Sequence, residues 1–302
     1  MLSGKERGGV EIVADIPNVI VAESIPIEAM EEINKLMKNG DLFRYTSENS
    51  AVKRLEDAFA KKIGANYALA VSSCSAALFL SMKALSLPER ASILIPAFTF
   101  AAVPSAIIHA GCIPILCECG ENYRIDLEDF KRKIGLADAV LISHMRGHTS
   151  DMDAIFAQCD EAGVPIIEDA AHSLGTTWNG KMIGTFGKIG CFSFQSYKLL
   201  NSGEGGVLVT DDPEILAKAV IMSGAYEHNW KKHIGLKRCF EKWQNKLPLY
   251  NLRLNNLSAV LLNAQLPELE RRVQDGRRNH DLTAERLNRS PWISVPEKLD
   301  LE

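Results

Sequence analysis

The chain has 302 residues, of which 46% are hydrophobic and 24% charged, and its formal net charge is −4. This length and composition argue against a disordered chain and indicate a large buried core, in one large domain or one plus a smaller one. The charges are mixed and form no basic stripe, which argues against nucleic acid or an anionic membrane as the main partner. A small molecule is the expected partner.

The seven cysteines are odd in number and lie mostly in apolar segments, as reduced core cysteines do. The one close pair, Cys117 and Cys119, has neither the spacing of a redox motif nor a second pair for a zinc site, so no metal is expected. The N-terminus lacks the apolar core of a signal peptide, and no run reaches the roughly 20 apolar residues of a membrane span. We therefore expect a cytoplasmic protein without a membrane partner.

Apolar residues at helical spacing predict two opening helices, at residues 27–37 and 50–63. Seven short apolar runs then predict strands at residues 67–71, 92–95, 113–117, 139–143, 165–169, 190–194 and 206–209. Helices are predicted between several of them, at residues 75–85, 101–110, 127–134 and 152–161. Buried strands that alternate with helices predict an α/β fold with a mainly parallel sheet, whose ligand lies beyond the carboxyl ends of the strands.

The last helices are predicted at residues 213–222, 256–273 and 277–287. Asp212 is placed to cap the first of these, and Pro213 stands at its first position, where a missing N–H does no harm. Residues 223–250 are weakly periodic and rich in Trp, Lys, His and Asn. They are predicted to form a long functional loop that leads out of the main domain.

Residues 191–206 read CFSFQSYKLLNSGEGG, an apolar run that ends near Lys198 and a Gly-rich turn. Imine chemistry needs such a lysine, because an amine in a shaped, partly dry pocket loses its proton more easily and can attack a carbonyl. The alternative is an ordinary basic residue at a strand end, and this stretch alone does not choose between the two.

Three other strand ends carry residues of chemical interest. Small residues, Ser72 to Ser75, turn into a helix whose start could bind a phosphate, although a serine there could simply cap the helix. Asp169 ends a buried strand, where a carboxylate needs a cation such as a protonated ring nitrogen. His172 could reach the same ring or complete a core hydrogen bond, and Phe100 could stack on a flat cofactor or belong to the core.

A lysine nucleophile, an acid for a ring nitrogen, an aromatic plate and a phosphate cradle are together the parts of a pyridoxal-phosphate site. The chain also resembles a family, the DegT/DnrJ/StrS group of pyridoxal-phosphate aminotransferases, over roughly residues 25–278. The resemblance depends on five segments in order: SSCSAAL, IPAFTFAA, IEDAAHSLG, GTFGKIGCFSFQSYKLLNSGEGG and YNLRLNNLSAVLLNAQL.

The resemblance implies a role for each of nine residues. Lys198 would form the internal aldimine with pyridoxal 5'-phosphate and shuttle the proton between substrate and cofactor. The residues implied to hold the cofactor are Asp169 at the ring nitrogen, His172 near the ring hydroxyl, Phe100 on the ring face, Cys74, Ser75 and Ser193 at the phosphate, and Asn251 with Arg253 near it. Asn251 would reach in from a second subunit, which implies a homodimer with shared sites.

The resemblance further implies an aspartate-aminotransferase-like (fold type I) large domain at residues 1–245 and a small C-terminal domain that starts at residue 246. Family members continue well past the position of Glu302, so we expect this small domain to be incomplete and the activity of the chain to depend on what is missing. Cys74 also departs from the usual Ser-Gly-Thr phosphate motif, since it adds a side chain where Gly gives free backbone approach.

The expected reaction moves an amino group from glutamate or glutamine to a keto-sugar or keto-cyclitol. Two alternatives stay open at this stage. A deoxysugar dehydratase of the same scaffold would have His in place of the lysine, so Lys198 argues against it. A catalytically impaired regulatory or ligand-sensing protein of the same fold is favoured only by the short C-terminus.

Overall fold

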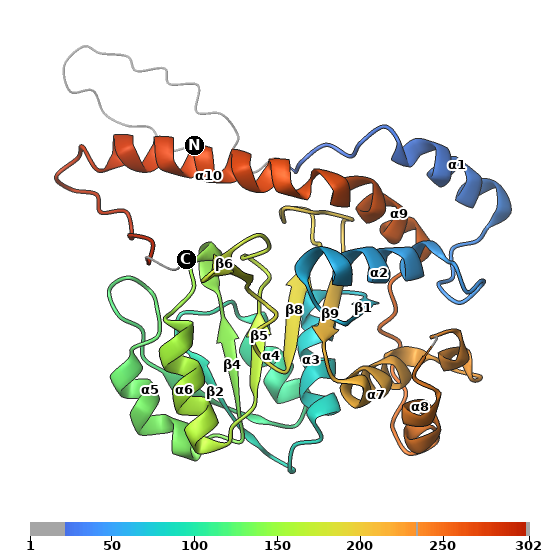
Figure 1. Cartoon of the computed structure of the whole chain (residues 1–302), viewed down its shortest axis with the longest axis horizontal. Helices are drawn as coiled ribbons and strands as arrows, with labels where there is room; N and C mark the ends of the chain where they lie inside the picture. Colours follow the sequence, from blue (N-terminus) through green and yellow to red (C-terminus); the bar gives the residue numbers. More distant parts are fainter. Residues whose placement is uncertain (1–21, 234, 300–302) are drawn as a thin grey trace, which may run out of the picture.

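The computed structural model describes residues 22–233 and 235–299. In this part of the chain, seven strands form one sheet in the order β1-β9-β8-β5-β4-β2-β3, and a separate hairpin pairs β6 with β7 (Figure 1). The strands are β1 (Tyr67–Val71), β2 (Ser92–Pro96), β3 (Ile113–Cys117), β4 (Ala139–Ser143), β5 (Ile166–Asp169), β6 (Thr177–Trp178), β7 (Lys181–Met182), β8 (Ile189–Ser193) and β9 (Gly206–Thr210).

The large sheet is mainly parallel, as predicted. Each of β8, β5, β4, β2 and β3 runs parallel to its neighbour in that order, whereas β9 runs antiparallel to both β8 and β1. The carboxyl ends of β4, β5 and β8 therefore meet at one edge of the sheet. All seven predicted strands are present within one residue of their predicted ends.

Ten α-helices are found among the described residues: α1 (Ala29–Asn39), α2 (Ala51–Ile63), α3 (Cys74–Leu85), α4 (Ala102–His109), α5 (Leu127–Lys133), α6 (Met152–Ala162), α7 (Pro213–Gly224), α8 (Lys237–Trp243), α9 (Asn256–Gln265) and α10 (Leu269–Leu287). Several begin at a side chain that accepts a hydrogen bond from a free N–H of the first turn. Asp212 caps α7 in this way, with Pro213 next to it, as predicted.

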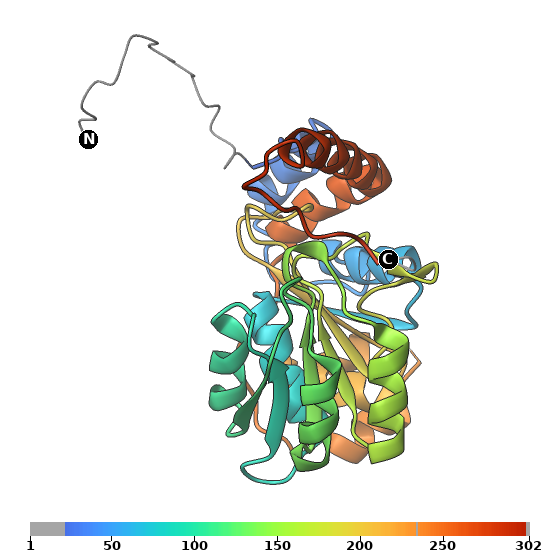
Figure 2. The same cartoon turned by 90° about the vertical axis from the view of Figure 1, so that its left-hand side faces the viewer.

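Both faces of the sheet are covered. Along β1, Ala68 and Ala70 pack into one hydrophobic core with α1, α2, α5, α6 and α9, while Leu69 and Val71 pack into a second core with α3, α4, α7 and α8. Successive side chains of a strand point to opposite faces, so burial on both sides explains the continuous apolar runs. Figure 2 shows the sheet between these layers, with α4 and α6 on opposite sides.

The prediction of a long loop at residues 223–250 is wrong. The segment contains a 3₁₀ helix (Asn229–Lys232) and α8, and α8 packs against α7. Phe240 is fully buried and stacks on Trp230, with ring centroids 5.2 Å apart. The aromatic residues that weakened the helical periodicity thus cover one face of the sheet rather than leading away from it.

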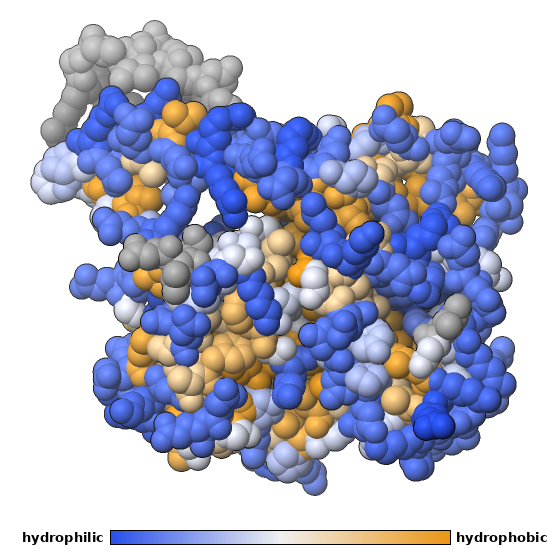
Figure 3. Space-filling model, viewed as in Figure 1, coloured by the Kyte–Doolittle hydropathy of each residue, from blue (hydrophilic) through white to orange (hydrophobic). Residues whose placement is uncertain are grey.

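The predicted break between the last two helices is misplaced. A 3₁₀ turn (Leu266–Glu268) separates α9 from α10, and α10 then runs unbroken through residues 274–276. Pro267 lacks the N–H that would continue the α-helical hydrogen bonds, which accounts for the break at that point. Hydrophilic side chains cover most of α10 on the face shown in Figure 3.

Within residues 22–233 and 235–299, none of the helices is both long enough and apolar enough to cross a membrane. The same residues contain no cluster of three or more His, Cys, Asp or Glu side chains that could hold a metal ion.

Candidate active site

A cavity of about 540 Å³ opens at the carboxyl ends of β4, β5 and β8, next to the start of α3. This volume is within the range of small-molecule sites. The cavity brings together seven of the nine predicted site residues: Cys74, Ser75, Phe100, Asp169, His172, Ser193 and Lys198.

Asp169, the last residue of β5, is held in place by neutral donors. Its Oδ2 accepts a hydrogen bond from the Ser143 hydroxyl at 2.9 Å, and its Oδ1 accepts one from the Ala171 N–H at 3.1 Å. Thr99 donates in turn to Ser143 at 2.7 Å. Only 6% of Asp169 is exposed, yet no cation lies within ion-pair distance among the described residues. This buried carboxylate is therefore ready to pair with a cationic group of a ligand.

Lys198 lies in the loop of the hairpin that joins β8 to β9. Its N–H donates to the Gln195 carbonyl at 2.8 Å, and further along the loop Ser202 donates to Phe194 at 2.9 Å. Burial lowers the pKa of the Lys198 ammonium below its ordinary value of 10.5, and the Asp169 carboxylate partly opposes the shift. A lowered pKa provides more of the neutral amine, the form that attacks a carbonyl.

The Gly-rich turn of this hairpin allows the start of β9 to pack closely against the start of α3. A Cβ atom on Gly206 would lie 2.4 Å from the carbonyl carbon of Ser73 and 2.5 Å from the amide nitrogen of Cys74. Only glycine lets β9 approach the first turn of α3 so closely. Because β8 and β9 pair antiparallel, the Gly-rich turn after Lys198 brings the chain back alongside β8.

The start of α3 combines a cap with free donors. Ser73 caps the helix by accepting a hydrogen bond from the Ala76 N–H at 3.1 Å, so the capping alternative is correct for this serine. The amides of Cys74 and Ser75 belong to the first turn, where N–H groups have no acceptor within the helix. Ser75 is exposed and lines the cavity. Together these groups form a site suited to an anion.

The Cys74 thiol contacts the Asp169 carboxylate in the wall of the cavity, with 3.7 Å between Sγ and Oδ1. Burial, helped by the Asp169 carboxylate, raises the pKa of the Cys74 thiol well above its usual range. The thiol therefore stays protonated and can donate to the carboxylate. The residue that departs from the family's phosphate motif thus also contacts the residue expected at the ring nitrogen.

His172 accepts a hydrogen bond at Nδ1 from the Arg146 N–H, at 3.4 Å. Burial lowers the pKa of His172, the nearby cations Lys198 and Arg146 add to the shift, and the Asp169 carboxylate partly opposes it. The ring is therefore neutral at pH 7, with its proton on Nε2, which is left as a donor.

Two predicted residues lie away from the cavity. Asn251 is exposed and does not line it. Arg253 donates to the Gly224 carbonyl at 2.7 Å and stacks over the Tyr226 ring, 4.8 Å from its centroid. Their segment runs along the end of β1, where Ser72 donates to the Leu252 carbonyl at 2.8 Å.

Sequence reasoning assigned no role to Ser143 or Arg146, although both line the cavity. Ser143 ends β4 just as Asp169 ends β5. Its position at the carboxyl end of a predicted strand was therefore the signal that could have identified Ser143. Arg146 has a positive φ of 60°, unusual for a residue other than glycine, and is exposed at the cavity.

The neighbouring Glu168 has a structural function. It is fully buried, and its two oxygens accept hydrogen bonds at 2.7 Å from the N–H groups of Gly184, Phe186 and Gly187. His144 lies 3.2 Å from the same carboxylate. Glu168 thus fixes the turn that leads into β8, while the adjacent Asp169 points into the cavity.

The sheet is mainly parallel, Asp169 ends β5, and Lys198 lies in the loop after the neighbouring β8. These features define a fold type I α/β protein. The chain belongs to the DegT/DnrJ/EryC1/StrS aminotransferase family, whose model matches residues 24–300. The resemblance inferred from the five segments is confirmed.

Two relatives and one solved structure illustrate the similarity. The chain is 33% identical over 231 residues to GDP-perosamine synthase of Vibrio cholerae, covering 76% of this chain and 60% of the relative. It is 32% identical over 261 residues to the spore coat polysaccharide biosynthesis protein SpsC of Bacillus subtilis, covering 84% and 65%. The chain thus spans about three fifths of these relatives' length.

The structure resembles that of GDP-4-keto-6-deoxymannose-3-dehydratase with a trapped PLP-glutamate geminal diamine. The TM-score is 0.80 at 25% sequence identity, and the match covers 92% of this chain and 75% of the other. The predicted fold class is confirmed.

Proposed function

We propose that this protein is a pyridoxal-phosphate-dependent aminotransferase that moves an amino group from glutamate or glutamine to a keto-sugar or keto-cyclitol. The observation that carries the proposal is that one cavity contains both the partly buried Lys198 amine and the buried Asp169 carboxylate, which forms no ion pair among the described residues. When bound, pyridoxal phosphate supplies an electron sink for the substrate carbon that loses its proton.

The residues of the cavity fit this cofactor. The Asp169 carboxylate would keep the ring nitrogen protonated, while Ser143 orients the carboxylate. We assign the phosphate to Ser75, Ser193 and the first N–H groups of α3, including that of Cys74. Phe100, which is 62% exposed, would lie over the ring face, and the His172 Nε2–H would donate to the ring hydroxyl.

Lys198 would act twice in the proposed reaction. Its amine would hold the cofactor covalently at the aldehyde carbon, with loss of water, and in its free form the same amine would take and return the proton at the substrate carbon. Both tasks need the neutral amine, and burial favours that form.

Arg146 supports an amino donor that carries a carboxylate. Its guanidinium makes no ion pair among the described residues, and its segment lines the cavity next to His172. The solved dehydratase was trapped with a PLP-glutamate adduct, which supports glutamate as donor. The Vibrio cholerae relative is a GDP-perosamine synthase, which supports a sugar acceptor.

The dehydratase alternative is disfavoured, because that branch has His where this chain keeps Lys198. A ligand-sensing protein without turnover is distinguished by experiment, as described below.

We also propose a homodimer with shared sites. Asn251 is exposed and lies away from the cavity of its own chain, as expected for a residue that completes the site of a second subunit. A cytoplasmic location is supported by the seven cysteines, all of which are free. The division into a large domain (residues 1–245) and a small domain that starts at residue 246 stays a prediction.

The test combines cofactor attachment with turnover. The protein is incubated with pyridoxal 5'-phosphate, reduced with borohydride and digested, and the modified peptide is identified by mass spectrometry. Keto acceptors are then screened with glutamate and glutamine, and aminated products are detected by mass. We expect attachment at Lys198, loss of attachment in Lys198→Ala, and an aminated product.

Attachment at another lysine would refute the assignment of Lys198. Attachment at Lys198 that no amino donor reverses would favour the sensing alternative over the aminotransferase.

A further inference from the structure

The loop that carries Lys198 is fastened from behind by the C-terminal helices. Gln265, the last residue of α9, clamps the main chain of Asn201 at two points. Its Oε1 accepts a hydrogen bond from the Asn201 N–H at 3.1 Å, and its Nε2 donates to the Asn201 carbonyl at 2.6 Å. A glutamine amide used in this way pairs with the loop as a neighbouring strand would.

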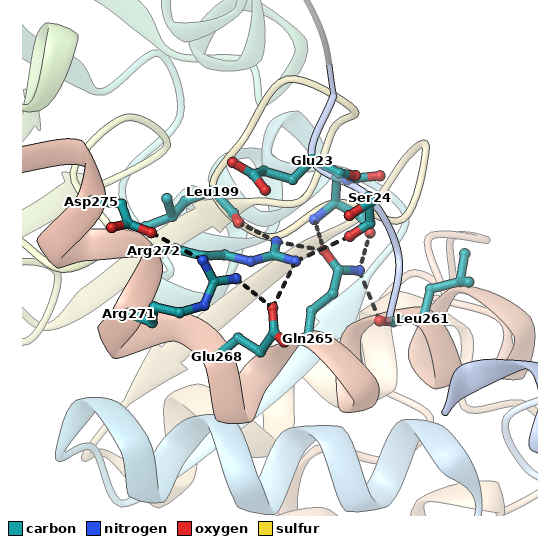
Figure 4. Close-up of polar contacts among 10 residues, drawn as sticks. Glu23, Ser24, Leu199, Leu261, Gln265, Glu268, Arg271, Arg272 and Asp275 are labelled. Carbon is teal, nitrogen blue, oxygen red and sulfur yellow. Dashed lines mark hydrogen bonds and ion pairs between the residues drawn. The ribbon is translucent and has the colours of Figure 1, made fainter. Parts of the chain in front are cut away.

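Arg272, in the first turn of α10, secures a second point of the same loop. Its Nη1 donates to the Leu199 carbonyl at 2.8 Å and to Gln265 Oε1 at 3.0 Å, and its Nη2 donates to the Ser24 carbonyl at 3.3 Å (Figure 4). One guanidinium thus joins the lysine loop, the clamping glutamine and the N-terminal segment.

Both side chains are buried, since Arg272 is 3% exposed and Gln265 is completely inaccessible. A guanidinium is costly to bury, and among the described residues that of Arg272 forms an ion pair only with Glu268, which lies 3.5 Å away and is partly exposed. The remaining partners of Arg272 are oxygens of this loop, of Gln265 and of the N-terminal segment. The Arg272 guanidinium therefore mainly holds main-chain carbonyl groups in place.

The clamped residues flank the lysine closely. Leu199 follows Lys198 directly, and Asn201 is two residues further on. Asn201 also donates from Nδ2 to the Glu23 carbonyl at 3.1 Å, which adds a third attachment. Displacement of a reacting group by about 1 Å can reduce a rate about 100-fold, so the position of this main chain matters for an amine that has to reach a carbonyl carbon.

We propose that Gln265 and Arg272 are positioning residues for Lys198: from outside the cavity, they hold the loop so that the amine stays in its partly buried place. The inference rests on the proposed function for the use of the amine, but the placement itself can be tested without turnover. The charged or titratable groups that interact with Lys198 are Asp169, Cys74, Arg146 and His172. They lie on other elements, so substitution of Gln265 or Arg272 leaves them unchanged.

The variants are Arg272→Met and Gln265→Leu, with Arg271→Met as the matched control. Arg271 is the adjacent residue of α10, but its side chain is 59% exposed and contacts Glu268 and Asp275 instead of the loop. Arg272→Lys is the conservative variant, because one ammonium can donate to Leu199 but cannot span Gln265 and Ser24 as well.

Three measurements are made on each variant of the 302-residue chain. They are the pH dependence of Lys198 acylation in the cofactor-free protein, hydrogen exchange of peptides that span residues 194–205, and the fraction of Lys198 that links to pyridoxal 5'-phosphate. For Arg272→Met and Gln265→Leu we expect the acylation midpoint to rise toward that of an ordinary lysine, exchange to accelerate about tenfold, and the linked fraction to fall. Arg271→Met should match the native protein, and Arg272→Lys should be intermediate.

An unchanged acylation midpoint and unchanged exchange in both variants, even with a lower melting temperature, would overturn the inference. If Arg272→Met and Gln265→Leu do not fold, Arg272→Lys and Gln265→Asn decide by the same two readouts. If the native protein links no pyridoxal 5'-phosphate at Lys198, the proposed function fails, while acylation and exchange still decide whether the loop is positioned from behind.

Discussion

Gly206→Ala is expected to damage the anion site at the start of α3 as well as to lower the stability of the fold. The new Cβ would lie 2.4 Å from the carbonyl carbon of Ser73, and ordinary contact begins at 3.4 Å, so the two backbones have to separate by about 1 Å. Both neighbouring atoms are main chain, so a rotamer change cannot relieve the overlap.

Overpacking of this kind costs about 1–3 kcal/mol of stability. A shift of about 1 Å in the donors of the anion site should weaken the hold on a phosphate about 10- to 100-fold. The assay compares binding of pyridoxal 5'-phosphate with binding of pyridoxal, which lacks the phosphate, and follows urea unfolding in parallel. We expect the preference for the phosphorylated form to fall while binding of pyridoxal changes little.

Gly135→Ala is the control, because its Cβ would meet no atom within 4 Å. If Gly206→Ala keeps the native preference for pyridoxal 5'-phosphate, the first turn of α3 is not the phosphate site, and our reading of this contact is wrong.

Three further predictions concern other parts of the site. Glu168→Gln should lower the free energy of unfolding by about 3 kcal/mol or more, because an amide then faces buried N–H donors; a loss below about 1 kcal/mol in urea unfolding would contradict the role of Glu168. Arg146→Gln should raise the KM for glutamate about tenfold with little change in kcat, as for a contact made equally in ground and transition states, and an unchanged KM in steady-state kinetics would exclude Arg146 as the carboxylate partner. Burial lowers the pKa of Lys198, so the folded chain binds the lysine proton more weakly than the unfolded chain does. Lys198 therefore reduces the free energy of unfolding at low pH, and this reduction disappears as the pH rises from the lowered pKa toward 10.5. The free energy of unfolding of the native protein should rise across this pH window relative to that of Lys198→Met. Parallel dependence on pH in the two proteins would contradict the prediction.

The sequence was sufficient for the elements that depend on local pattern. Strands buried on both faces appear in the sequence as continuous apolar runs, and a capping residue marks the start of a helix such as α7. The order of the elements was therefore predictable. The acid and the lysine were also predictable, because each follows an apolar run that had to be a strand. Seven of the nine candidate residues line one cavity for this reason.

Contacts between distant segments were not predictable in the same way. Arg272 reaches a carbonyl 73 residues earlier in the chain, and nothing in the charged pattern of α10 distinguishes it from the exposed Arg271. The packing of α8 was also hidden, because Trp230 and Phe240 lie in a stretch with weak periodicity. Its basis is the contact of α8 with α7 and the stacking of Phe240 on Trp230.

The clamp behind Lys198 has a consequence for the synthesis of the protein. Its parts are made at three different times, since Ser24 is made before Leu199 and Arg272 is made after both. The sheet can form as soon as β9 has emerged, because domains fold as units from the N-terminal side during synthesis. The lysine, however, acquires its final position only when α10 closes over the loop. A nascent chain that ends between β9 and α10 would therefore contain the seven-stranded sheet but a loosely held amine, so the reactivity of Lys198 develops only after the sheet has formed.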